Sequence, residues 1–147
     1  MICFSDSNYI TTNETWHVQA YNINQVGSIT GAFAGTTQQY DELGYLATEL
    51  FAHPGDGNLQ NAIWYVLGTG GANNSDYQNA VNFVTDNPWY RTTDIFYIPT
   101  GRNLPTVDGR TPQPFICQTA VPEPSSLLLL GAGLMGVLVL SLKKAAA

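Results

Sequence analysis

Apolar and polar positions alternate in short stretches near both ends of the first 119 residues, and such alternation is typical of strands. A strand is predicted over residues 16–21, where β-favouring side chains alternate roughly with polar ones. Two more strands are predicted over residues 94–99 and 115–117. The small, turn-rich stretch around residues 29–33 is expected to add one further short strand.

Between these segments, apolar residues recur every three or four positions, as they do on one face of a helix. Three helices are predicted, over residues 39–51, 59–67 and 77–85. In the first of them, Leu43, Leu46 and Leu50 form the apolar face. Asn58 is the expected cap of the second helix.

Strands toward both ends with helices between them predict a small mixed domain of the α+β class. We expect the terminal strands to pair, which brings Cys3 and Cys117 onto neighbouring parts of one sheet. Residues 1–119 are enough for one compact domain and no more.

The end of the chain departs from both spacings, because residues 127–142 form one uncharged apolar run. As a helix this run is about 24 Å long, which makes a short bilayer crossing. Two prolines keep the chain around Glu123 extended just before the run. Lys143 and Lys144 follow it, and positive charge marks the cytoplasmic side of a transmembrane helix. The rest of the chain is therefore expected outside the cytoplasm.

This order of parts resembles the PEP-CTERM sorting signal, also known as the C-terminal domain of ice-binding proteins. The matching residues are the motif Val121, Pro122, Glu123 and Pro124, the glycine-rich apolar run and the basic end. The resemblance implies export in a Gram-negative bacterium through the inner membrane. It also implies an exosortase as partner, which processes the chain near the motif. A plain C-terminal membrane anchor is the alternative.

The chain is thus expected to have three parts: an exported domain over 1–119, a linker with the sorting motif over 120–126, and a transmembrane helix with a basic tail over 127–147. Residues 1–6 have neither the basic nor the apolar region of a signal peptide, so we expect the true start to lie upstream. Residues 131–136 read G-x-G-x-x-G but lack the strand and acid of a dinucleotide site, and no cofactor is expected.

Acidic residues dominate the charge of the part before the apolar run, with 11 acids against three arginines and a formal charge of −8. This balance argues against nucleic acid and anionic membrane surfaces as partners. His17 and His53 lack second ligands at metal spacing, so no metal site is expected. The sequence presents no carboxylate pair at a hydrolase spacing, and we expect a protein that is not an enzyme.

Two short motifs carry the remaining candidate chemistry. Residues 2–6, with Cys3, and residues 59–64, with Gln60, are similar to the Cys and Gln-x-Ala-Ile-Trp motifs of thioester adhesin domains. The resemblance implies a bond between the Cys3 sulfur and the Gln60 side chain, formed as the thiolate attacks the carboxamide and ammonia leaves. Such an acyl donor attaches covalently to an amine-bearing target.

Other interpretations of these residues stay open. Two cysteines in an exported chain favour a Cys3–Cys117 disulfide, which would stabilise the fold by about 4–5 kcal/mol, and both thiols being free is the third case. Gln60 and Trp64 alternatively belong to an ordinary core helix. The leading hypothesis is a structural or adhesive protein of the cell surface or extracellular matrix, which binds extracellular polysaccharide or a surface protein. The thioester is the alternative function.

Overall fold

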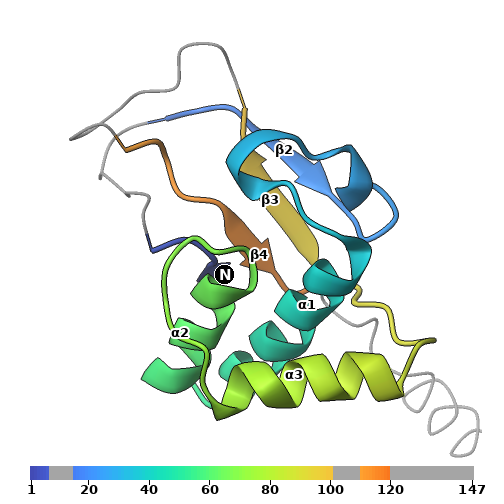
Figure 1. The fold of residues 1–147 in the computed structure, drawn as a ribbon. Helices are drawn as coiled ribbons and strands as arrows, with labels where there is room; N and C mark the ends of the chain where they lie inside the picture. Colours follow the sequence, from blue (N-terminus) through green and yellow to red (C-terminus); the bar gives the residue numbers. More distant parts are fainter. Residues whose placement is uncertain (7–14, 101–109, 120–147) are drawn as a thin grey trace, which may run out of the picture.

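One antiparallel sheet of four strands organises the fold, in the order β1-β4-β3-β2 (Figure 1). The computed structural model describes residues 1–6, 15–100 and 110–119. The strands are β1 (Ile2–Cys3), β2 (Val18–Tyr21), β3 (Ile95–Pro99) and β4 (Phe115–Cys117). Strand β1, which had not been predicted as a strand, pairs with β4 and forms one edge of the sheet. Cys3 and Cys117 therefore lie on neighbouring parts of one sheet, as expected.

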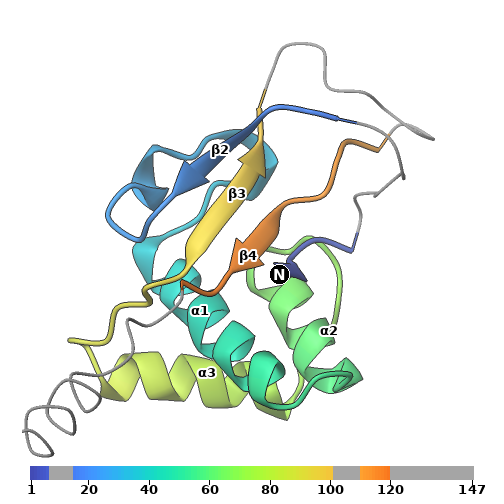
Figure 2. The same cartoon turned by 180° about the vertical axis from the view of Figure 1, so that it is seen from behind.

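The register gives the sheet a buried face and an open face. One row of cross-strand neighbours is buried and belongs to the core: Ile2, Ile116, Phe96 and Tyr21. The adjacent row points to the opposite face, because side chains alternate along a strand: Cys3, Phe115, Tyr97 and Ala20. In Figure 2 this sheet lies in front of the segment with the two 3-10 turns, η1 (Val26–Ser28) and η2 (Gly31–Phe33).

Three helices gather at the side of the sheet and contact one another: α1 (Thr37–Ala52), α2 (Gly57–Val66) and α3 (Ser75–Asp86). Aromatic pairs mark the contacts between them. Tyr45 of α1 stacks on Phe83 of α3 at 4.5 Å between ring centroids, and Tyr65 of α2 meets Tyr77 of α3 edge to face at 4.9 Å. Helix packing therefore rests on large apolar side chains.

The core joins α1 to the sheet through three aromatic rings that are wholly buried, Phe4, Tyr40 and Phe96. The ring of Phe96 meets Tyr40 at 4.7 Å and Phe4 at 6.2 Å, both edge to face. The Tyr40 hydroxyl donates a hydrogen bond of 2.7 Å to the carbonyl of Phe33, which satisfies the only polar group of that ring. Residues before β2, in α1 and in β3 are thus tied into one core.

The residues that cap the helices account for the differences between the predicted and the observed helix starts. Asp56 caps α2, in place of the expected Asn58, and Asn74 caps α3. The prediction of a short strand over residues 29–33 was wrong. Gly31 has φ +81° and opens the 3-10 turn η2, and this conformation does not extend a sheet. The other predicted strands and helices are confirmed within two residues at most ends.

The α+β class with terminal strands and central helices is confirmed for the described part of the chain. No helix within residues 1–6, 15–100 and 110–119 is long and apolar enough to cross a bilayer. The apolar run over 127–142, where the transmembrane helix is predicted, lies outside the described residues.

Candidate functional site

Helix α2 brings Gln60 against the edge strand β1. The side-chain Nε2 of Gln60 donates a hydrogen bond of 2.9 Å to the backbone carbonyl oxygen of Cys3. Gln60 occupies the first turn of α2, whose start is fixed by Asp56: its Oδ1 accepts hydrogen bonds from the backbone N–H groups of Asn58 at 2.8 Å and Leu59 at 3.3 Å. The structure therefore brings together the two residues that the thioester hypothesis joins.

The chain on both sides of Cys3 is held in place by contacts with distant segments. Phe4 is wholly buried, and its carbonyl accepts a hydrogen bond of 3.0 Å from the Thr69 hydroxyl. The carbonyl of Ser5 accepts one from the side chain of Gln113 at 2.6 Å. Cys3 is thus fixed against α2 although it is the third residue of the chain.

Trp64 lies one helical turn after Gln60, on the same side of α2. Its indole Nε1 is buried and has no hydrogen-bond partner within the described ranges. Burial raises the pKa of the Cys3 thiol, while the adjacent Trp64 indole acts in the opposite direction on that pKa. Gln60 thus hydrogen-bonds the backbone of Cys3, whereas the Trp64 indole lies near the Cys3 thiol without a well-formed hydrogen bond to it.

Gly71 lets the loop after α2 close over this site. It has φ +70°, and a Cβ at this position would lie 2.0 Å from the Asn61 carbonyl oxygen and 3.0 Å from the Cβ of Trp64. The Ala72 N–H donates a hydrogen bond of 3.2 Å to the same Asn61 carbonyl. A side chain at Gly71 would push this loop off α2, which explains the glycine.

Cys117 lies on the same sheet face as Cys3 but not directly across from it. The register pairs Cys3 with Phe115, so Cys117 is its diagonal neighbour on β4. Diagonal neighbours are about 7–8 Å apart, more than the usual separation of disulfide-bonded Cα atoms. Both thiols are free and half-buried in the structure. The Cys3–Cys117 disulfide stays a prediction, and its formation would require the backbone to move.

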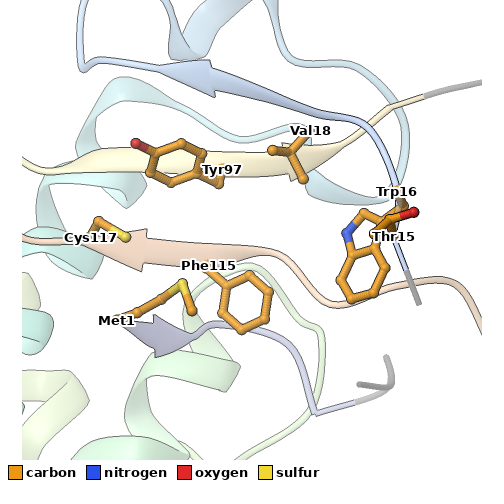
Figure 3. Close-up of a pocket in the computed structure, with 7 residues that line it drawn as sticks. All are labelled: Met1, Thr15, Trp16, Val18, Tyr97, Phe115 and Cys117. Atoms are coloured by element: carbon orange, nitrogen blue, oxygen red, sulfur yellow. The ribbon is translucent and has the colours of Figure 1, made fainter. Parts of the chain in front are cut away.

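Cys117 belongs instead to an apolar hollow of about 320 Å³ on the open face of the sheet (Figure 3). Its lining comes from β2, β3, β4 and the residues just before β1 and β2: Met1, Thr15, Trp16, Val18, Tyr97, Phe115 and Cys117. This hollow could not be predicted from the sequence, because its residues come from four separate segments that only the register brings together.

A second hollow, of about 430 Å³, lies beside Gln60. Its lining joins the end of α1, the turn before α2 and the start of the chain: Met1, Ile2, Leu50, Phe51, Pro54, Gly55, Asp56, Gly57 and Gln60. Most of these residues are apolar or glycine, and Asp56 is the one that carries a charged side chain. Gln60 thus borders Cys3 on one side and this hollow on the other.

Three buried carboxyl groups lie outside both hollows. Asp41, Glu42 and Asp94 are each at most 3% exposed, and burial raises the pKa of all three. Asp41 accepts a hydrogen bond of 2.9 Å from the Thr92 N–H and lies 3.3 Å from the guanidinium of Arg91. These contacts tie α1 to the segment that leads into β3. The burial of these carboxyl groups was not predicted, because the apolar spacing of α1 and of β3 does not indicate where a neighbouring acid is covered.

No three His, Cys, Asp or Glu side chains converge as metal ligands anywhere in the part of the chain that the structure describes. His17 lies just before β2, where its carbonyl accepts a hydrogen bond of 2.9 Å from the Thr100 N–H. His53 is the C-cap of α1, and its ring contacts the Glu49 carbonyl at 3.1 Å. The two histidines are thus in separate parts of the fold.

Comparison with known proteins finds a match to a protein family at the end of the chain. The sequence model of the PEP-CTERM protein-sorting motif matches residues 120–144. The chain carries a PEP-CTERM sorting signal. The match includes the predicted motif Val121, Pro122, Glu123 and Pro124 and the basic pair Lys143 and Lys144, all of which lie outside the described residues. No curated protein matches the chain, and no solved structure matches it either.

The PEP-CTERM signal identifies the chain as an exosortase-sorted protein. Such sorting implies passage through the membrane and export from a Gram-negative cell. The prediction from the tail is confirmed to this extent.

Proposed function

We propose that the chain is a structural or adhesive protein, without enzymatic activity, of the cell surface or extracellular matrix. The PEP-CTERM signal over 120–144 carries this proposal, because it delivers the domain before it to the outside of the cell. Before processing, residues 127–142 would span the inner membrane, with Lys143 and Lys144 in the cytoplasm. Exosortase would then act on the extended segment around Glu123.

The open face of the sheet supports an adhesive role. Aromatic side chains are enriched at contact surfaces, because they offer a large apolar area together with a polar group. Trp16, Tyr97 and Phe115 line the hollow on this face, in a domain without lysine. Extracellular polysaccharide or a surface protein is the partner that we propose for this face.

Substitution of Glu123 tests delivery by the sorting signal. We expect Glu123→Ala, and likewise Pro124→Ala, to leave the full-length chain in the membrane fraction of the native host, because the processing enzyme recognises this segment. Ser126→Ala, three residues beyond Glu123, is the matched control and should be processed normally. Immunoblots of membrane and released fractions measure the outcome. Normal release of the Glu123→Ala chain would show that the tail acts only as an anchor.

The second candidate function is covalent attachment through a thioester, and the hydrogen bond between Gln60 and Cys3 favours it. In this reaction the Cys3 sulfur attacks Cδ of Gln60, the C–S bond forms, the C–N bond breaks, and the thiol proton leaves with the nitrogen as ammonia. The observed bond goes to the backbone of Cys3, so the sulfur has to turn toward Cδ before it reacts. A target amine would then take the acyl group and return the thiol.

Intact mass decides between the states of Cys3. We expect the purified protein to be lighter than its sequence by one ammonia, whereas a disulfide would remove only two hydrogen atoms. Gln60→Ala should restore the full mass of that variant. Gln78→Ala is the matched control, because it removes the same side chain from an exposed position of another helix, α3. A wild-type mass equal to that of the sequence would exclude the thioester.

A further inference from the structure

The hollow beside Gln60 offers a second reactant a path to the proposed acyl group. Gln60 contacts the backbone of Cys3 and also lines the hollow of about 430 Å³. Cys3 itself does not line that hollow. A nucleophile in the hollow would therefore approach Cδ of Gln60 from a side other than that of the sulfur it displaces. Leu50, Phe51 and Pro54 supply an apolar wall for an alkyl chain along this path.

Carboxylate groups gather at one side of the path, around Asp56. Asp56 is exposed, and both of its capping hydrogen bonds go to Oδ1, so Oδ2 takes no part in the cap. Asp56 also lines an adjacent hollow of about 240 Å³ together with Glu49, Asp76 and His53. The arginine side chains of the described ranges, Arg91 and Arg110, line neither hollow. Met1 also lines the hollow beside Gln60, so the α-ammonium group of the chain lies in the same region. Acidic groups in such a cluster attract positively charged ligands.

We propose that Asp56 selects a primary alkylamine that carries a second positive charge as the nucleophile of this site. The inference rests on the proposed thioester. The protonated amine first loses one proton to solvent. Its nitrogen then forms a bond to Cδ of Gln60 while the C–S bond breaks. The Cys3 sulfur takes a second proton from the amine and is released as a thiol. The carboxylate of Asp56 stabilises both the positive charge that develops on the attacking nitrogen and the charge at the far end of the chain.

The absence of lysine fits this selection. Residues 1–119 contain no lysine, so the domain offers no side-chain amine of its own to a site that favours cationic amines. Selection by charge would then act only on amines from other molecules.

Two amine nucleophiles of similar length test the inference, because the groups at their far ends carry opposite charges. 1,4-Diaminobutane keeps a cationic group there, and 4-aminobutyrate has an anionic one. We expect the wild-type protein to add the diamine faster, as measured by mass spectrometry over time. The ratio of the two rates should fall by about three- to tenfold in Asp56→Asn, the change expected when one nearby charge is removed. A ratio cancels any change in thioester reactivity itself.

The controls separate the possible failures. Asparagine caps helices as well as aspartate, so Asp56→Asn should keep its helical circular dichroism. Asp86→Asn removes the same charge from the exposed far end of α3, about 16 Å along that helix from its start, and should keep the wild-type ratio. An unchanged ratio in Asp56→Asn would overturn the role of Asp56 alone. A wild-type protein of full mass that adds neither amine would overturn the thioester and this inference together.

Discussion

The indole nitrogen of Trp64 is a single atom whose position near the Cys3 thiol could not be predicted from the sequence. Its ring fits the apolar spacing of α2, which predicted it as a core residue, and it is indeed partly buried against the core. The sequence did not indicate that its Nε1 would be buried without a partner beside the Cys3 thiol. Helical spacing places a side chain on a face, but it does not assign the contacts of each polar atom.

Trp64→Phe should make the Cys3 thiol less acidic. The substitution keeps most of the ring but removes the N–H that opposes the effect of burial on the thiol pKa. In a Gln60→Ala background, where the thiol stays free, alkylation of Cys3 at a fixed pH below its pKa should slow by about two- to tenfold. Peptide mass spectrometry across a pH series separates Cys3 from Cys117. Trp89→Phe, at a ring that is 77% exposed, is the control, and an unchanged pH profile in Trp64→Phe would contradict this role of the indole.

The helices and strands were easier to predict than the register in which the strands pair. The spacing of Leu43, Leu46 and Leu50 correctly indicated α1, and the cysteine-bearing segments were correctly expected on one sheet. Sequence spacing could not predict the register that pairs Cys3 with Phe115 and makes Cys117 a diagonal neighbour. A shift by one residue would reverse every face, and only tertiary burial of the row through Phe96 excludes it.

The motif chemistry of Gln60 and Cys3 was predicted more fully than its surroundings. The resemblance to thioester adhesin motifs implied that Gln60 and Cys3 meet across 57 positions, and the Gln60 side chain does contact the Cys3 backbone. The bond between the Cys3 sulfur and Gln60 stays a prediction. The hollow next to them depends on the turn between α1 and α2, where Asp56 rather than Asn58 is the cap. Several residues of that turn can accept N–H groups, so the choice among them is made by the packing of α1 against α2.

At the scale of the whole molecule, an exported domain of low charge density buries three carboxyl groups. Burial raises the pKa of Asp41, Glu42 and Asp94, so the folded state binds more protons than the unfolded state above the ordinary pKa of a carboxyl group. The free energy of unfolding therefore falls as pH rises from that ordinary value through the raised values. These three groups therefore make the domain lose stability as pH rises through their raised pKa values, an effect that the net charge alone does not indicate.

Asp94→Asn should weaken this dependence on pH. The Oδ2 of Asp94 is buried and has no hydrogen-bond partner among the residues that the structure describes, so its ionised form is costly at neutral pH. We expect the amide to stabilise the protein at neutral pH by about 1 kcal/mol and to change little at acidic pH, where the carboxyl is protonated. Urea unfolding of the released protein between about pH 5 and pH 8 measures the effect, with the exposed Asp86→Asn as the control. A wild-type stability that rises with pH over this interval, or an Asp94→Asn variant with the wild-type slope, would contradict the assignment. The reason is that burial, with Oδ2 left unpaired, outweighs the hydrogen bond from Thr92 and disfavours ionisation of Asp94.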